Sequence, residues 1–292
     1  MLEEIMEIIA DALLDSLKVF PFLFLMYVLI EFLENSTNIT KNKNILRGRL
    51  APLLGAATGI IPQCGFSVMA AKLYDKKIIR TGTVLAVFLA TSDEALIILL
   101  SEGTKAFAVM PVIAVKFVVA VAAGYLVNGL YRNENLSELS ENEAIRGNAC
   151  GHDHEEDSKV RRYLLHPLVH SVQIFAYILV VNLAFGFAMH FAEVPITNFL
   201  EQGLWFQPLI AGLVGLIPNC ASSVLVTQSY VLGAISFGGM MAGLCANAGL
   251  GFVILFKNIR EWKRNLLLVA VLYAVSVGVG YATLGVMHLF GI

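Results

Sequence analysis

The sequence predicts an all-α integral membrane protein of two inverted repeats. Each repeat has three transmembrane helices and a Pro-broken re-entrant hairpin, which gives ten membrane segments. Three observations lead to this fold class. Hydrophobic residues make up 58% of the chain and charged residues only 14%, outside the range of soluble domains. The apolar residues form stretches of about 20, long enough to cross a bilayer. A proline-containing motif occurs once in each half.

The apolar stretches form two groups of four, separated by a polar connection. They run over residues 13–33, 50–73, 79–101, 105–130, 164–191, 203–229, 234–256 and 265–290. The connection is rich in Glu, Asn and Ser and breaks the apolar pattern, as a linker does. The sequence thus predicts membrane repeat 1 over 1–131, a linker over 132–162 and membrane repeat 2 over 163–292.

The repeated motif identifies the duplication. Gly59-Ile60-Ile61-Pro62-Gln63-Cys64 returns 156 positions later as Gly215-Leu216-Ile217-Pro218-Asn219-Cys220. Matching proline-interrupted apolar segments in two halves are the best sequence pointer to a transporter's binding site. Duplication also occurs in membrane proteins that transport nothing, but here the breaks are repeated as well as the helices, which favours transport.

The basic residues predict the topology. If the segments with Pro62 and Pro218 enter the membrane and return to the same side, each half crosses the membrane three times. An odd number of crossings gives the two repeats opposite orientations. Then 17 of the 20 Lys and Arg residues fall on one side, as the positive-inside rule requires of the cytoplasm. We therefore expect a multi-pass protein of the inner or plasma membrane, with both termini outside and residues 132–162 in the cytoplasm. The alternative is an ordinary Pro-kinked helix with buried cysteines.

The hairpin tips are candidate binding sites. Proline removes a backbone donor and stops the first arm, and the freed carbonyls are tolerated only where they line a cavity in the protein. Arms of about 12 residues rise roughly 18 Å, slightly past the bilayer midplane. We expect four side chains to meet near the centre: Gln63, Cys64, Asn219 and Cys220.

Adjacent carboxylates interrupt an apolar stretch of the first half. The segment Thr91-Ser92-Asp93-Glu94-Ala95 contains two of them, Asp93 and Glu94. A carboxylate inside a membrane span is costly, so by default it suggests a functional site. Lys116, in the stretch 105–130, is the expected partner, and a metal ion or proton would release the carboxylate from it. The alternative is an ion pair that only fixes packing.

The second half lacks these acids. Asn247-Ala248-Gly249-Leu250 stands at the matching positions, with Cys245 two residues earlier. We expect one half to supply charge and the other to supply amide, thiol and exposed carbonyl groups. The glycines near Asn247 fit close helix packing equally well.

The linker contains a candidate metal chelator. Cys150, His152 and His154 lie within a run of acidic residues and together suit a borderline metal such as Zn or Mn. Their spacing matches no closed structural zinc site. The alternative is a solvated linker that happens to contain two histidines.

The chain resembles the ten-transmembrane heavy-metal exporter family, whose members are also labelled arsenic efflux permeases or manganese transporters. The duplicated Pro-(Gln/Asn)-Cys segments, the stretch 91–95 and the His-bearing loop carry the resemblance, which covers nearly the whole chain. It implies efflux from the cell. No Walker-type Gly-x-x-x-x-Gly-Lys-(Ser/Thr) motif is present, so we expect proton coupling.

The chemistry of the candidate residues leaves the substrate open. Oxygens of Asp93, Glu94, Gln63, Asn219 and Asn247 suit a divalent transition metal such as Mn²⁺. Thiols of Cys64, Cys220 and Cys245 suit arsenite or an organoarsenical, and the hairpin N-termini with Lys116 suit an organic anion. We favour the divalent cation, exported by proton-coupled alternating access.

Other classes of function fit less well. A channel would share the hairpins but would not need an exchangeable carboxylate–lysine pair. A thiol oxidoreductase would normally carry a Cys-x-x-Cys motif, which is missing, so we do not expect an enzyme. The expected partners are the lipid bilayer and the transported metal or metalloid ion, with no cofactor and no nucleic acid. A homo-oligomer is left open.

Overall fold

The computed structural model describes residues 48–61, 65–91, 95–101, 106–131, 203–258 and 261–290, with scattered helical positions at 6–24 and 168–183. Every regular element among these residues is a helix. The first half contains α3 (Ala51–Gly59), α4 (Gly65–Asp75), α5 (Thr81–Ala90), α6 (Ala95–Ser101), the 3₁₀ turn η2 (Ala106–Ala108) and α7 (Val109–Leu130). The second contains α9 (Gln207–Gly215), α10 (Cys220–Val231), α11 (Phe237–Ala246), α12 (Gly251–Lys257) and α13 (Trp262–Phe290).

The helices of the two halves have matching bounds. α3 and α9, α5 and α11, and α6 and α12 each begin and end 156 positions apart, the spacing of the repeated motif. α4 and α10 end at matching positions as well. α3 and α9 both carry a proline in the first turn, Pro52 and Pro208, where the missing N–H costs no hydrogen bond. The same local signals therefore produce the same helices twice.

In the first half, α3 and α5 lie side by side and run in the same direction. A Cβ atom on Gly55 would lie 3.1 Å from the carbonyl oxygen of Thr83, near the start of α5. A Cβ atom on Gly59 would lie 2.6 Å from the carbonyl oxygen of Val87, near its end. Because the two helices are parallel, the chain between them, which includes α4, must return to the end where α3 began.

The second half repeats this arrangement. A Cβ atom on Gly239, near the start of α11, would lie 3.2 Å from Cβ of Gln207, the first residue of α9. At the other end of α9, Gly215 meets the carbonyl group of Gly243. The chain that contains α10 therefore also doubles back.

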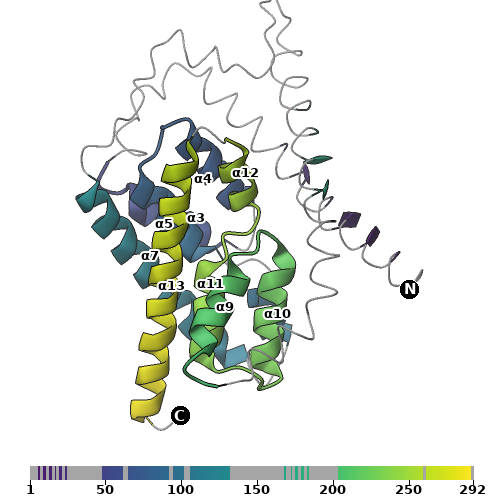
Figure 1. Cartoon of the computed structure of the whole chain (residues 1–292), viewed down its shortest axis with the longest axis vertical. Coiled ribbons are helices and arrows are strands. Elements are labelled where there is room, and N and C mark those ends of the chain that lie inside the picture. The colour runs from purple at the N-terminus through teal and green to yellow at the C-terminus, as the bar shows by residue number, and fades with distance from the viewer. Residues whose placement is uncertain are drawn as a thin grey trace, which may run out of the picture.

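The long helix α13 shows how the two halves are oriented. Its 29 residues extend about 43 Å. Its first turns share a pocket with Thr81, the first residue of α5. Near its other end, Gly280 and Leu284 contact Gly238, at the start of α11. α5 and α11 therefore begin toward opposite ends of α13, and Figure 1 shows α3, α4 and α5 higher along it than α9, α10 and α11.

The halves contact each other reciprocally. α4 packs against α12, and α10 packs against α6; Figure 1 shows α12 beside α4, away from α9 and α10. The rings of Phe88 and Phe252 meet edge to face at 5.7 Å. At the end of α12, Asn258 Nδ2 donates to Asp75 Oδ1 over 2.7 Å. Each half thus places its second and fourth short helices against the other half.

Four segments of the described chain are long and apolar enough to cross a membrane: Thr81–Ser101, Ala106–Leu130, Phe237–Lys257 and Trp262–Leu289. Two of them differ from the continuous spans that the sequence indicated. α5 ends at Ala90 and α6 begins at Ala95, while α11 ends at Ala246 and α12 begins at Gly251. Each of these spans is therefore two half-helices joined by an interruption, and both are mostly buried inside the protein.

Candidate functional site

The first interruption begins at Thr91, which is buried. Its backbone N–H donates to the carbonyl groups of Val87 and Phe88, and its Oγ1 donates to the Val87 carbonyl oxygen over 2.8 Å. The Thr91 hydroxyl is therefore used inside α5. Its carbonyl oxygen lies past the end of the helix, where no intrahelical donor exists.

Lys116 supplies that donor. Its side chain is fully buried in the middle of α7, and its Nζ donates to the Thr91 carbonyl oxygen over 2.5 Å. It also donates to the Leu244 carbonyl oxygen of α11 over 2.6 Å. Both acceptors are at helix C-terminal ends, which carry partial negative charge and favour a cation. One ammonium group therefore joins the ends of two half-helices that start at opposite ends of the protein.

The second interruption is shaped by Asn247. Its Oδ1 accepts from the Gly249 N–H over 2.6 Å, and Gly249 has a φ of 52°, which favours glycine. Its Nδ2 donates to Ser222 Oγ on α10 over 3.4 Å. The Asn247 side chain, only 3% exposed, thus forms the turn and ties it to the neighbouring helix.

The tip between α9 and α10 is built around Asn219. The residue caps α10 by accepting from the Ala221 N–H at 3.4 Å, and its own N–H donates to the Ile217 carbonyl oxygen. Ser222 Oγ donates to the Asn219 carbonyl oxygen over 2.8 Å. Because Ser222 also accepts from Asn247, the predicted residues Asn219 and Asn247 belong to one buried network.

The C-terminal ends of α3 and α9 lie beside the C-terminal ends of α5 and α11. A Cβ atom on Gly59, beside the first tip, would lie 2.8 Å from Cβ of Ala90 at the end of α5. A Cβ atom on Gly215, beside the second tip, would lie 3.1 Å from Cβ of Ala246 at the end of α11. The ends of α3 and α9 are therefore both near the helix ends that Lys116 bridges.

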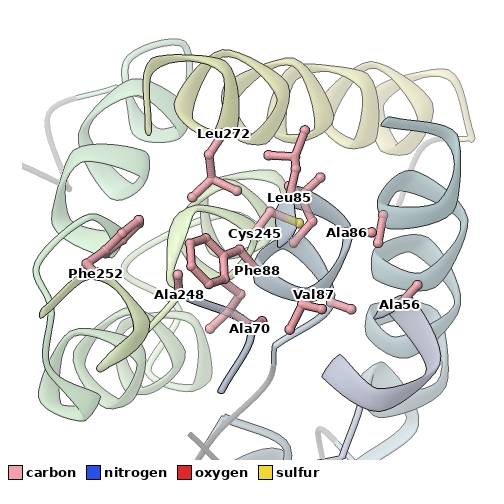
Figure 2. Close-up of a cluster of buried hydrophobic side chains, with 14 of the residues drawn as sticks. Ala56, Ala70, Leu85, Ala86, Val87, Phe88, Cys245, Ala248, Phe252 and Leu272 are labelled. Carbon is pink, nitrogen blue, oxygen red and sulfur yellow. The ribbon is translucent and has the colours of Figure 1, made fainter. Parts of the chain in front are cut away.

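Cys245 lies in a different environment. It is fully buried, and Figure 2 shows its sulfur inside an apolar cluster beside Leu85 and Phe88. Its neighbour Leu244 contributes only a backbone carbonyl group to Lys116. The Cys245 thiol therefore lies in the packed core but close enough to Lys116 for an electrostatic interaction with its ammonium group. The hydrogen-bonded polar network lies at Asn219, Ser222 and Asn247.

Several predicted site residues lie outside the described residues, and their roles stay predictions. They are Pro62, Gln63 and Cys64 at the first tip, Ser92, Asp93 and Glu94 at the first interruption, and Cys150, His152 and His154 of the linker. Pro218 is described at the second tip, and Cys220 is the first residue of α10. Within the described ranges no group of three His, Cys, Asp or Glu side chains is placed to hold a metal ion.

Sequence reasoning missed two kinds of group at this site. Ser222 hydrogen-bonds to Asn219, before α10, and to Asn247, after α11. Its position three residues after a helix-capping residue is a sequence signal that could have identified it. The carbonyl oxygens of Thr91 and Leu244 carry no side-chain signal at all. Only the approach of α5, α7 and α11 reveals that they face one ammonium group.

Comparison with known families identifies the chain. The family model described as "Putative, 10TM heavy-metal exporter" matches residues 1–199 and 169–288. No curated protein and no solved structure matched. The family match covers nearly the whole chain, and its ten membrane segments agree with a protein whose described helices include four of membrane-spanning length. The chain therefore belongs to this family of heavy-metal exporters and is a multi-pass membrane transport protein.

Proposed function

We propose that the protein exports a divalent transition-metal cation, Mn²⁺-like in its preference for oxygen ligands, by proton-coupled alternating access. The observation that carries this proposal is the position of Lys116. A buried cation already occupies the point where two half-helix C-termini meet. Interrupted helices of secondary transporters coordinate cations through such C-terminal ends and exposed carbonyl groups.

The directions of the helices support inverted repeats with re-entrant hairpins. α3 and α9 each lead to a tip at the depth of an interruption, and the chain then doubles back before α5 and α11 begin. α5 and α11 begin toward opposite ends of α13 and end at the same ammonium group. We infer that one hairpin enters from each face of the membrane and that the ion site lies near the midplane.

In the proposed cycle, Lys116 holds the site while the metal is absent. Metal arriving from the cytoplasm binds the carboxylates of Asp93 and Glu94 with amide oxygens of Asn219 and Asn247, and displaces the ammonium group from its partners. Rocking of the two halves then exposes the site to the outside, where protonation of the carboxylates weakens metal binding. The halves then rock back, the carboxylates release their protons to the cytoplasm, and Lys116 returns to the carbonyl groups.

The test is metal uptake into everted membrane vesicles energised by a proton gradient. We expect Mn²⁺ or Zn²⁺ uptake by the wild type, loss of uptake in Asp93→Asn, and retention in Cys64→Ser. A protonophore should collapse the gradient and the uptake together. Uptake that persists with the protonophore present would argue for a channel.

The second candidate is efflux of arsenite through the thiols of Cys64 and Cys220. The repeated Pro-x-Cys motif favours it, because both thiols would then lie at the tips. Arsenite uptake that is lost in Cys64→Ser and kept in Asp93→Asn would replace the divalent-cation proposal with this one. A chain that moves neither class of substrate in the same vesicles would contradict both.

A further inference from the structure

A pocket of about 190 Å³ lies between the two halves, away from the ion site. The first half contributes Tyr74 of α4, Thr81 of α5, and Val127 and Tyr131 at the end of α7. The second half contributes the first turns of α13. These supply three aliphatic side chains and one cationic side chain, Leu267, Leu268, Val271 and Arg264. The exposed surface of the pocket is therefore almost entirely apolar, and Arg264 borders it with its guanidinium nitrogens Nε and Nη2 covered.

Arg264 has unused hydrogen-bonding capacity. Its guanidinium group stacks on the Tyr74 ring with Cζ 4.4 Å from the ring centroid. Nη1 lies 3.8 Å from a carboxylate oxygen of Glu261. Nε and Nη2 are buried and have no hydrogen-bond partner in the described part of the chain. A buried guanidinium nitrogen without an acceptor is costly, so the site favours an anionic ligand.

The pocket lies at the end of two candidate membrane spans. Val127 and Tyr131 close the span Ala106–Leu130, and Arg264 lies in the first turn of the span that begins at Trp262. Trp262 is 52% exposed and Tyr131 is 40% exposed. Aromatic residues of this kind, with basic neighbours, are enriched where a span meets the lipid headgroups.

We propose that this pocket binds the phosphate of an anionic phospholipid from the surrounding leaflet. The guanidinium group, now covered and stacked on Tyr74, would turn toward the pocket and receive the phosphate through Nε and Nη2 in a two-pronged contact. The acyl chains would lie along the aliphatic residues, of which Leu267 is 47% exposed and already faces outward. Because both halves line the pocket, the bound lipid bridges them. Basic pockets between transmembrane helices commonly bind anionic headgroups.

The experiment measures lipid binding to the full-length protein in detergent after delipidation. The protein is titrated with phosphatidylglycerol, phosphatidylcholine or inorganic phosphate, and bound lipid is counted by native mass spectrometry beside the thermal unfolding temperature. We expect phosphatidylglycerol to bind saturably and to stabilise the wild type more than phosphatidylcholine does. Arg264→Gln should weaken that binding about tenfold or more, as loss of charged hydrogen bonds does.

Lys263→Gln is the matched control, because it removes the same charge from the neighbouring exposed position. It should change phosphatidylglycerol binding by less than about twofold, as an exposed charge does. Glu261 pairs with Lys77 at 3.3 Å and with Arg264 at 3.8 Å. Glu261→Gln should strengthen lipid binding, since it removes a carboxylate that competes with the phosphate for Arg264. This variant also tests the proposal should Arg264→Gln fail to fold.

Three outcomes would overturn the proposal. Equal losses in Arg264→Gln and Lys263→Gln would indicate a general surface charge effect. Equal binding of the two lipids by the wild type would indicate an apolar groove that ignores the headgroup. Saturation by inorganic phosphate, with no further effect of phosphatidylglycerol, would assign the pocket to a free anion.

Discussion

Lys116 Nζ lies 2.6 Å from the Leu244 carbonyl oxygen and so joins α7 of the first half to α11 of the second. The position in α13 that matches Lys116 is Leu272, which is fully buried in the apolar core. The two halves therefore have matching helices but different chemistry at this point. One half places a cation at the junction, and the other closes the corresponding space with a hydrocarbon side chain.

Replacing Lys116 should slow transport much more than it destabilises the fold. Lys116→Leu gives the first half the residue of the second, and it leaves the Thr91 and Leu244 carbonyl groups without their ammonium donor. Each unsatisfied carbonyl costs about 1–3 kcal/mol. Removal of a buried charge offsets part of that cost. We expect at least tenfold slower metal uptake into everted vesicles, with only a modest fall in the unfolding temperature.

Leu272→Met is the control for this change, because it alters the matching position and keeps the volume and polarity of the core. It should cost less than about 1.5 kcal/mol of stability. Its rate of uptake should stay close to that of the wild type. If Lys116→Leu transports as fast as Leu272→Met, the lysine has a packing role and the proposed cycle is wrong.

Asn247 should be needed for the shape of the second interruption. Asn247→Ala removes the acceptor of the Gly249 N–H and the donor to Ser222 Oγ, so we expect a loss of about 0.5–2 kcal/mol, as for a helix cap. Asn247→Asp keeps the acceptor and should retain more of the stability. Thermal unfolding of both variants measures the difference. Equal destabilisation by Ala and Asp would show that the turn does not depend on this acceptor.

The close approach of helices at the tips should reject a methyl group. Gly215→Ala would place Cβ against the Gly243 carbonyl group, and Gly59→Ala would place it 2.6 Å from the Val87 carbonyl oxygen. Because these contacts are to backbone, we expect each change to cost about 1–3 kcal/mol. This destabilisation is measured as a lower unfolding temperature and a reduced yield of protein in the membrane.

Gly129→Ala and Gly278→Ala are matched controls, since both glycines lie within helices and a Cβ atom there would meet nothing within 4 Å. Alanine favours a helix by up to about 1 kcal/mol over glycine. Both controls should therefore match or exceed the stability of the wild type. Tolerance of alanine at Gly59 and Gly215 would mean that the tips are not packed against α5 and α11 in the membrane.

Inverted repeats make a clear prediction about sidedness. Lys76, between α4 and α5, and Leu232, between α10 and α11, are exposed and occupy matching positions of the two halves. Single cysteines placed there, in a chain whose native cysteines are replaced, should react with an impermeant maleimide from opposite sides. Lys76→Cys should be labelled in everted vesicles and Leu232→Cys in intact cells. Labelling of both from the same side would contradict the inversion.

Cys245 should prove dispensable for metal transport. Its sulfur lies in the apolar cluster of Figure 2, close to Lys116 but outside the hydrogen-bonded network of Asn219, Ser222 and Asn247. Cys245→Ala should therefore cost about 1 kcal/mol of packing and leave the uptake rate within about twofold. If Cys245→Ala folds normally but loses metal uptake, the Cys245 thiol is a ligand of the transported ion.

Much of the architecture could be predicted from the sequence because the signals are local. Apolar length indicated the spans, and the repeated motif indicated that the same helices would form twice, as the matching bounds of α3 and α9 illustrate. The interruption of the spans 81–101 and 237–257 was harder to see. The residues Asn247-Ala248-Gly249 look compatible with a helix packed through glycine, and only the turn made by Asn247 Oδ1 shows the break.

The sequence by itself determined the class of protein, the duplication and the set of polar residues in apolar stretches that are candidates for a functional site. The length of an apolar segment, and the rule that backbone groups in lipid must be hydrogen-bonded within the protein, can be applied to the sequence without a folded structure. The tertiary structure decided which groups meet. Lys116 reaches carbonyl oxygens 25 and 128 residues away, and no pattern along the chain marks a carbonyl group as an acceptor. Such contacts depend on how α5, α7 and α11 pack.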